Sequence, residues 1–164
     1  MLKVGLLSDT HGFLDPDILR FFSGCGEIWH AGDIGGMAIA DKLQSFSTLR
    51  AVFGNIDDQS VRSSFPRVLL FTVENLKVFL THIGGYPGHY EKGIREQLGE
   101  SKPGLFIAGH SHILKVMPDP KLGLLHINPG AAGRSGFHLV QTAVRFMVNG
   151  ERITELDVYE KPRR

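Results

Sequence analysis

Apolar runs alternate with amphipathic stretches in the first third of the chain. Residues Leu2–Leu7 form an almost continuous apolar run, which is typical of a strand buried on both faces of a sheet. An amphipathic stretch follows, in which Asp15 fits a helix N-cap and Pro16 fits the first helical position. A strand, a helix and a strand are then expected at Glu27–His30, Met37–Phe46 and Leu49–Phe53. This β-α-β-α-β order predicts parallel strands joined by right-handed crossovers.

The pattern changes in the second part of the chain, where strand signals outnumber helix signals. A β-hairpin is predicted from Val68–Val73 and Lys77–Thr81 around the pair Asn75-Leu76, and a helix is predicted over Tyr90–Leu98. Later strands are expected at Leu105–Ala108, Lys115–Met117, Leu124–Ile127, Val140–Val148 and Arg152–Tyr159. The last two strands are expected to meet through Asn149-Gly150, a strong hairpin signal.

These elements predict an α/β protein of the four-layer α+β type. Its core is expected to be a sandwich of two β-sheets with mixed parallel and antiparallel strands, flanked by helices. The 164 residues, 42% of them apolar, suit one globular domain spanning residues 1–164. The sequence contains no internal repeat and no low-complexity linker.

Charge and composition exclude several classes of partner. A net charge of +1 gives no broad field for nucleic acid, so any affinity for phosphate must come from a local site. The apolar start breaks at Ser8-Asp9, too early for a signal peptide, and nothing approaches the ~20 apolar residues of a membrane span. The single cysteine allows no internal disulfide. We therefore expect a cytoplasmic protein without a membrane partner, and the sequence leaves a homo-oligomer open.

Five short motifs carry side chains that commonly bind metal ions, and each directly follows an apolar run. They are Asp9-Thr10-His11, Gly32-Asp33, Gly54-Asn55-Ile56-Asp57, Thr81-His82 and Gly109-His110-Ser111-His112. Taken singly, most of them also fit ordinary turns and helix caps. In extended backbone, residues two positions apart point to the same side, so Asp9 with His11, and His110 with His112, are expected to present paired ligands.

The five motifs together indicate more than turns. Strand ends collect along one edge of a partly parallel sheet, so these side chains are expected to converge. Carboxylate, carboxamide and imidazole groups in this number suggest two divalent ions rather than one, with Asp33 bridging ions roughly 3.5–4 Å apart. Two adjacent metal ions indicate hydrolysis of a phosphoester.

This set of motifs resembles the calcineurin-like metallophosphoesterase superfamily. The motifs D-x-H, G-D, G-N-x-[DE], a His after a strand, and G-H-x-H are all present in that order. The short chain and Asn128-Pro129-Gly130 after a late strand are similar to the small bacterial and archaeal phosphodiesterase subfamily, which also resembles a eukaryotic retromer subunit. The resemblance implies the metallophosphoesterase fold and a phosphodiesterase activity.

The resemblance also implies how the ligands divide between the two ions. The first metal would take Asp9, His11, Asp33 and His112, and the second would take Asp33, Asn55, His82 and His110. A hydroxide held between the ions at Asp33 would attack phosphorus. Manganese suits this mixed N/O set, while nickel, iron, zinc and cobalt stay open. The substrate is expected to be a small phosphodiester or a nucleotide-like molecule; a phosphomonoesterase and a non-catalytic scaffold are the alternatives.

One position departs from the family pattern. Many relatives carry a His after the motif Asn, and that His is thought to protonate the leaving alcohol, but this chain has Ile56. Losing a general acid costs about 10²–10⁴-fold on poor leaving groups. Asp57 and His30 are the candidates for supporting the site through other residues, although a structural role for His30 is the simpler interpretation. Four further residues are expected to be mainly structural or at the surface: His89, His126, His138 and Arg134.

Overall fold

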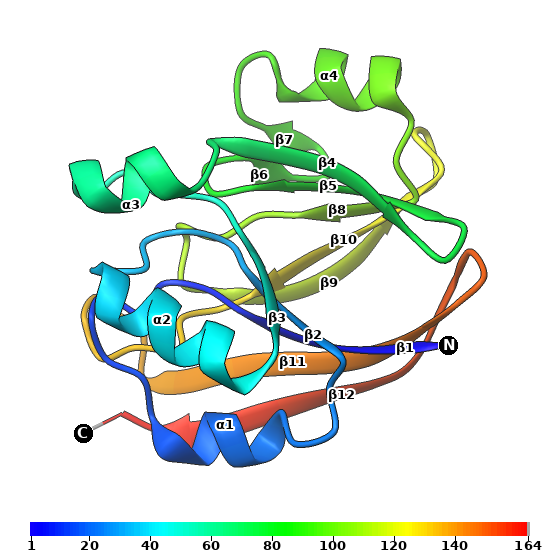
Figure 1. Ribbon diagram of the computed structural model, residues 1–164. Coiled ribbons are helices and arrows are strands. Elements are labelled where there is room, and N and C mark those ends of the chain that lie inside the picture. Colours follow the sequence, from blue (N-terminus) through cyan, green and yellow to red (C-terminus); the bar gives the residue numbers. More distant parts are fainter. Residues whose placement is uncertain (164) are drawn as a thin grey trace.

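Two five-stranded sheets pack face to face, with helices on their outer faces (Figure 1). The computed structural model describes residues 1–163. The first sheet has the order β12-β11-β1-β2-β3 and contains β1 (Leu2–Leu7), β2 (Glu27–His30), β3 (Thr48–Ala51), β11 (Val140–Asn149) and β12 (Arg152–Pro162). The second has the order β4-β5-β8-β10-β9 and contains β4 (Val68–Val73), β5 (Leu76–Thr81), β8 (Leu105–Ile107), β9 (Leu114–Asp119) and β10 (Leu124–Pro129). The predicted two-sheet sandwich with mixed strands is confirmed.

The main core lies between the two sheets. Trp29 is fully buried there, and its ring makes edge contacts with Phe71 from the second sheet and Phe146 from the first. The aliphatic residues around it come from both inner faces, among them Val4, Leu6, Val78, Leu80 and Ile107. Burial of this apolar surface fixes the separation and stacking of the sheets.

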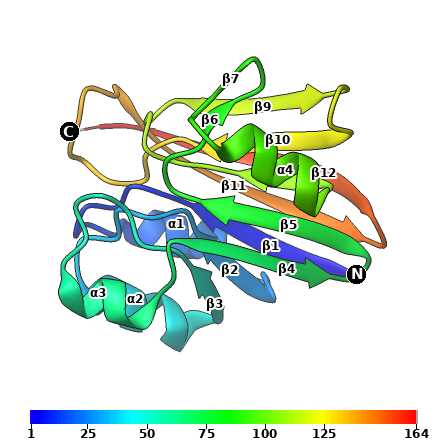
Figure 2. The same cartoon turned by 90° about the horizontal axis from the view of Figure 1, so that it is seen from above.

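Helices close the outer faces of the sandwich, as the two views show (Figures 1 and 2). Helices α1 (Pro16–Phe21) and α2 (Met37–Phe46) cover the first sheet through a cluster that includes Ile18, Phe22 and Leu43. Helix α4 (Ile94–Ser101) covers the second sheet through Ile94 and Leu98, and α3 (Gln59–Ser64) packs Val61 near α2. No helix within residues 1–163 is both long and apolar enough to span a bilayer.

The predicted start of α1 is confirmed in detail. The Asp15 carboxylate accepts a hydrogen bond from the Asp17 backbone N–H at 2.9 Å, and Pro16 occupies the first turn. Lys161 then ties the C-terminal strand to this helix, because its ammonium lies 2.9 Å from Asp15 and 2.8 Å from Asp17. Arg164, the last residue of the basic tail, lies outside the described residues.

The predicted helix over Tyr90–Leu98 is wrong in its first half. Tyr90 belongs to a small hairpin of β6 (Gly85–Tyr86) and β7 (His89–Tyr90), and the helix begins only at Ile94. The Tyr90 hydroxyl donates to the Asp119 carboxylate at 2.6 Å, and burial together with this carboxylate raises the Tyr90 pKa. This tertiary contact outweighs the helical periodicity of the segment.

Several boundaries also differ from the predictions. The third strand ends at Ala51 rather than Phe53, because the Phe53 N–H leaves the sheet and bonds Pro66 O. The turn between β4 and β5 contains Glu74 and Asn75, since Leu76 pairs with Val73. The last hairpin turns through Gly150 and Glu151, and Asn149 pairs with Arg152. Helix α3 carries no apolar periodicity and was not expected.

The topology brings two sets of strand ends to one edge of the sandwich. Strands β1, β2 and β3 run parallel in the first sheet, so their C-terminal ends lie together. Strands β5, β8 and β10 run parallel in the second sheet. The two sets meet where the His82 ring bonds the Ala31 carbonyl, and the candidate site forms at this edge.

Candidate metal centre

The five motifs follow β1, β2, β3, β5 and β8, and their side chains converge on two adjacent groups. The first group contains Asp9, His11 and His112, and the second contains Asp33, His82 and His110. Within each group, one ligand atom per residue lies within 4.8 Å of the others. The Asn55 carboxamide joins the second group, because its Oδ1 lies 3.0 Å from His82 Nε2 and 3.1 Å from His110 Nδ1.

The expectation of extended backbone within the motifs, with ligands paired two positions apart, is wrong. Asp9, His11, Asp33, His110 and His112 all have positive φ, between 48° and 71°, so the motifs are not extended. Asp9 and His11 still reach one group, but His110 and His112 point into different groups. Left-handed backbone at non-glycine residues is costly and collects at functional sites, where the surrounding structure enforces it.

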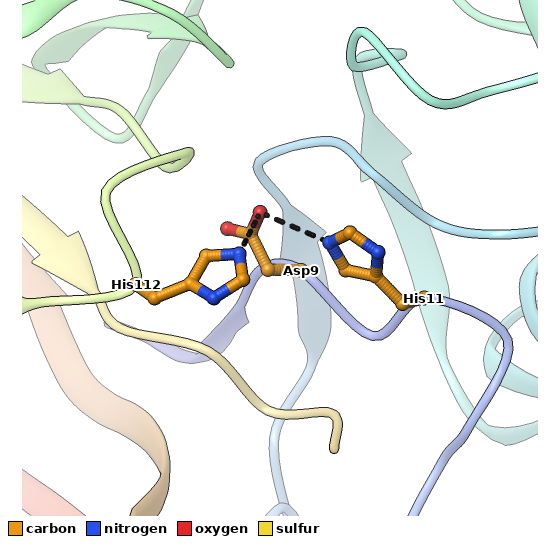
Figure 3. Close-up of side chains that lie close together, drawn as sticks. All are labelled: Asp9, His11 and His112. Atoms are coloured by element: carbon orange, nitrogen blue, oxygen red, sulfur yellow. Dashed lines mark ion pairs between the residues drawn. The ribbon is translucent and has the colours of Figure 1, made fainter. Parts of the chain in front are cut away.

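The first group converges on one carboxylate oxygen (Figure 3). Asp9 Oδ1 lies 3.2 Å from His112 Nε2 and 3.7 Å from His11 Nε2. Two ligands about 2.1 Å from one ion, at right angles, would lie about 3 Å apart, so this spacing suits coordination. The other oxygen is fixed, since Asp9 Oδ2 accepts from Ser8 Oγ at 2.6 Å and from the His110 N–H at 3.1 Å.

Asp33 lies between the two groups. Its Oδ2 is 3.3 Å from His11 Nε2 in the first group and 3.2 Å from His82 Nε2 in the second. Its Oδ1 accepts the Ile56 N–H at 3.0 Å, which fixes the direction of the carboxylate. Asp33 is therefore placed to contact ions in both groups.

One direct observation supports the fit of these residues to divalent ions. Asp9 Oδ1 and His11 Nε2 are buried, and neither has a hydrogen-bond partner in the described structure. Buried polar atoms without partners are rare and costly, and a pair of them facing each other suits a cation bound between them. Two carboxylates, one carboxamide and four imidazoles form a donor set suited to transition metals.

The pKa shifts of the ligand residues also agree with a site for cations. Burial opposes ionisation of Asp9, but the neighbouring imidazoles of His11, His112 and His82 outweigh it and hold the Asp9 pKa far below its usual range. Burial also works against Asp33, and the contact with His82 lowers the Asp33 pKa. The nearby Asp9 carboxylate raises the His11 pKa, and Asp33 raises the His82 pKa against the effect of burial.

Backbone and ring contacts fix the tautomers of three histidines. His82 Nδ1 lies 2.7 Å from Ala31 O, and a carbonyl can only accept, so Nδ1 carries the proton and Nε2 faces the site. His138 Nε2 likewise donates to Gly133 O at 2.8 Å. The unprotonated His138 Nδ1 then accepts from His112 Nδ1 at 3.2 Å, which directs His112 Nε2 at Asp9. The motifs gave no signal for this contact of His138.

Asp57 supports the site through the backbone rather than through a ligand side chain. Its carboxylate accepts N–H bonds from Gly54 at 2.7 Å, Gly35 at 2.8 Å and Ile34 at 3.2 Å. These bonds join the loop that carries Asp33 to the loop that carries Asn55. Asp57 therefore sets the relative position of those two residues.

His30 lies behind the site and links the loop that carries Asp33 to the loop that carries Asp9 and His11. Its Nδ1 accepts the Gly32 N–H at 3.1 Å, so its Nε2 carries the proton and donates to Thr10 Oγ1 at 3.0 Å. The Thr10 hydroxyl donates onward to Ile34 O at 2.7 Å. Burial lowers the His30 pKa to about 4, and this fully buried neutral ring has no path to substrate. We assign His30 a positioning role only.

Two glycines allow the loops to approach this closely. A Cβ at Gly54 would collide with Asp33, and a Cβ at Gly109 would collide with Ser8 Oγ. Gly109 therefore provides space for the close approach of Ser8. The Ile56 side chain is 46% exposed, so it adds nothing to the core and no proton to the site. Arg134 is stacked over the Phe13 ring, 3.8 Å from its centroid.

Comparison with known proteins identifies the family. A profile of the calcineurin-like phosphoesterase superfamily domain matches residues 2–151. The chain belongs to this superfamily. The resemblance carried by the five motifs is thus confirmed, and the family together with the two groups supports binding of divalent metals.

Relatives of this calcineurin-like domain are similar along most of its length. The "Probable metallophosphoesterase" of Methanothermobacter thermautotrophicus is 28% identical over 137 residues, covering 79% of this chain and 77% of that protein. Wild-type Vps29 complexed with Zn²⁺ from Entamoeba histolytica has a TM-score of 0.77 at 20% identity, covering 97% of this chain and 91% of that one. A "predicted phosphoesterase" from Streptococcus pneumoniae has a TM-score of 0.68 at 18% identity, covering 98% of both chains. The structural likeness shows a shared fold.

Metal binding to this calcineurin-like domain should release protons near neutral pH. His11 and His82 have raised pKa values, so protons on these ligands must leave before a metal binds. Affinity should therefore rise as pH rises through the raised values. The folding stability of the metal-free protein should depend on pH in the opposite direction. The contribution of His11 and His82 to the free energy of unfolding is fully present below their ordinary pKa of ~6.5, and it is lost as pH rises through the raised pKa values. Calorimetric titration with Mn²⁺ in buffers of different ionisation enthalpy measures the number of protons released. The same heat of binding in every buffer would contradict proton release.

His138→Phe should weaken metal binding by about 10–100-fold, the usual cost of removing a group that orients a histidine ligand. The phenyl ring keeps the bulk near His112, which meets the His138 ring at 5.0 Å between centroids, but it cannot accept the His112 proton. Titration of the metal-free protein with Mn²⁺ measures the change. Exposed Phe137→Leu, at the neighbouring position, is the control. Unchanged affinity in His138→Phe would show that the contact does not orient His112.

Proposed function

We propose that this protein is a dinuclear-metal-dependent phosphodiesterase. The observation that carries the proposal is the position of Asp33, with one carboxylate oxygen 3.3 Å from His11 in the first group and 3.2 Å from His82 in the second. One ion would be held by Asp9, His11, Asp33 and His112. The other would be held by Asp33, Asn55, His82 and His110. The ions would supply Lewis acidity, which activates water and neutralises charge on the phosphoryl group.

The protein's own residues hold this arrangement in place. The second carboxylate oxygens of Asp9 and Asp33 are occupied by hydrogen bonds, so each residue offers one directed oxygen. Ala31 fixes the ring of His82, and His138 fixes that of His112. Preorganised ligands need no rearrangement during the reaction, which is how such sites lower a barrier.

Charge favours a diester over a monoester. Two carboxylates facing two divalent ions leave the site with a modest positive charge, and the five motifs contain neither Lys nor Arg. A phosphodiester carries one negative charge, whereas a monoester dianion calls for further cations. Manganese is the proposed metal, because carboxamide and carboxylate oxygens suit it; zinc is supported by the Zn²⁺-bound Vps29 neighbour.

Hydrolysis assays separate the candidates. After removal of metal and reconstitution with Mn²⁺, the protein should hydrolyse bis(4-nitrophenyl) phosphate faster than 4-nitrophenyl phosphate, and His110→Ala should lose this activity. Turnover of the monoester alone would replace the diesterase with a phosphomonoesterase. If neither ester is cleaved and His110→Ala matches the parent, the enzyme proposal fails.

A non-catalytic scaffold is the second candidate. It is favoured by the fold shared with Vps29, one structure of which is a complex with a cyclic peptide, and by the absence of an imidazole at position 56. A protein that binds two ions tightly but cleaves neither ester would support this candidate over the enzyme.

A further inference from the structure

A cavity of about 360 Å³ opens directly beside His110. One wall comes from the segment that contains the β6–β7 hairpin, and the other comes from the loop and strand after β8. Its apolar surface includes Ile83, Tyr86 and Ile113, while His89 lies on the hairpin side. The size is within the range of small-molecule sites, and the apolar walls suit an organic group rather than free phosphate.

The residues that line the cavity include the buried His126. His126 is fully buried, and its Nδ1 donates to Phe106 O at 3.0 Å. The proton is therefore on Nδ1, and Nε2 is a lone-pair acceptor without a partner in the described structure. Burial lowers the His126 pKa to about 4, so the ring stays neutral near pH 7. His126 therefore contributes a neutral ring to the cavity lining.

Only one imidazole is left without a structural task. Of the eight histidines, four belong to the metal groups, His30 and His126 are buried and bonded, and His138 uses both ring nitrogens. His89 is exposed, and no hydrogen bond of its ring is present among residues 1–163. Its ring lies tilted against Tyr86, 4.9 Å between centroids. The cavity thus connects His89 to His110, a proposed metal ligand.

We propose that this cavity holds the leaving group of the phosphoester and that His89 protonates the departing oxygen. The proposal rests on the proposed function and supplies the proton that Ile56 cannot. As water adds to phosphorus, the bond from phosphorus to the leaving oxygen breaks and its electron pair stays on that oxygen. The oxygen takes a proton from the His89 imidazolium, and a proton from the attacking water restores it. The leaving group is a compact alcohol or phenol that fits the apolar walls of the cavity.

A series of aryl phenyl phosphodiesters with progressively less acidic leaving phenols tests the role of His89. General acids matter most for poor leaving groups, so His89→Gln should lose about 10²–10⁴-fold in kcat/KM at the basic end of the series. His89→Gln should lose less than about 10-fold in kcat/KM on the 4-nitrophenyl ester, because 4-nitrophenolate leaves without being protonated. The dependence of rate on leaving-group pKa should therefore become steeper in His89→Gln. An unchanged dependence would overturn the proposal.

Two further variants control the result. Lys115, in the same cavity with its ammonium 3.5 Å from the Tyr86 ring centroid, is the competing donor. Lys115→Gln should change kcat/KM by the same factor for every substrate of the series. A steeper dependence of rate on leaving-group pKa in Lys115→Gln, and not in His89→Gln, would overturn the assignment to His89. Adding Ile56→His to His89→Gln should restore at least about 10-fold of the activity on poor leaving groups. If this double variant binds as much metal as the parent but does not regain activity, the loss in His89→Gln is not the loss of a proton donor.

A binding measurement separates this inference from the proposed function. Methyl resonances of Ile83 and Ile113 in the metal-free protein should shift on addition of phenyl phosphate and not of inorganic phosphate. Shifts in a protein that cleaves no ester would refute the proposed function but not the cavity. Turnover of diesters with no shift of these methyls, and no effect of His89→Gln, would refute the cavity and leave the proposed function standing.

Discussion

Replacing Asp33 with Asn should remove both metal ions rather than one. The carboxylate contacts His11 and His82, which belong to different groups, so neutralising it weakens both sites together. Loss of an orienting neighbour alone costs 10–100-fold, so loss of this anionic ligand should cost more than about 100-fold in affinity. The kcat/KM for bis(4-nitrophenyl) phosphate should fall by at least about 10³-fold, equivalent to about 4 kcal/mol. Metal analysis after dialysis and titration with Mn²⁺ measure the first effect directly.

Asp41→Asn is the matched control for this change. Asp41 is exposed on α2, so the substitution removes the same charge without touching the site. Metal content and rate should match the parent. An Asp33→Asn protein that keeps two ions at parental affinity would contradict the bridging position of Asp33. Loss of one ion with the other retained would assign Asp33 to a single group.

Asp57→Ala should be the most destabilising single change at the site. Its carboxylate accepts three backbone N–H groups, of Gly54, Gly35 and Ile34, and alanine leaves them without a partner. An unsatisfied buried donor costs about 1–3 kcal/mol, so the free energy of unfolding should fall by about 3–5 kcal/mol after partial relaxation. Denaturant unfolding with a chelator present measures this without the added stability that a bound metal gives.

The neighbouring carboxylate provides the comparison. Asp58 caps α3 by accepting the Val61 N–H at 3.1 Å, and this is its only side-chain role in the described structure. Asp58→Ala should cost about 1 kcal/mol, the usual value for losing an N-cap. Equal costs at positions 57 and 58 would show that the three bonds of Asp57 do not hold the two loops together. Asp57→Ala should also weaken Mn²⁺ binding, whereas Asp58→Ala should not.

The order of strands and helices could be predicted because burial decides it. Leu2–Leu7 and Glu27–His30 are strands over the expected residues, and Met37–Phe46 is a helix with the expected bounds. Segments with strong apolar runs or periodic apolar faces form in the folded protein the same secondary structure that their local pattern predicts. Parallel strands then place their ends together, which is why the motif residues converge although they span most of the sequence.

Features set by tertiary contacts could not be predicted. Tyr90 leaves the helical pattern of its segment to reach Asp119, so the periodic signal there was misleading. Helix α3 buries only Val61 and therefore left no periodic signal. The positive φ angles of the ligand residues depend on bonds between loops, such as the one from the His11 N–H to Asp33 O at 3.0 Å. His138 contacts His112 from a loop without a recognisable motif, so its role emerges only when the two rings are seen together.

Each proposed ion would take ligands from both halves of the sandwich. Asp9, His11 and Asp33 follow strands of the first sheet, whereas His82, His110 and His112 follow strands of the second. Metal would join the two sheets at this edge, whereas at the opposite edge their hairpin turns are joined by the bond from the Asn75 N–H to Gly150 O at 3.0 Å. Chelation should then let the sheets part first at the metal-binding edge, and amide hydrogen exchange should accelerate in the loops around His11 and His112 before it does at Trp29.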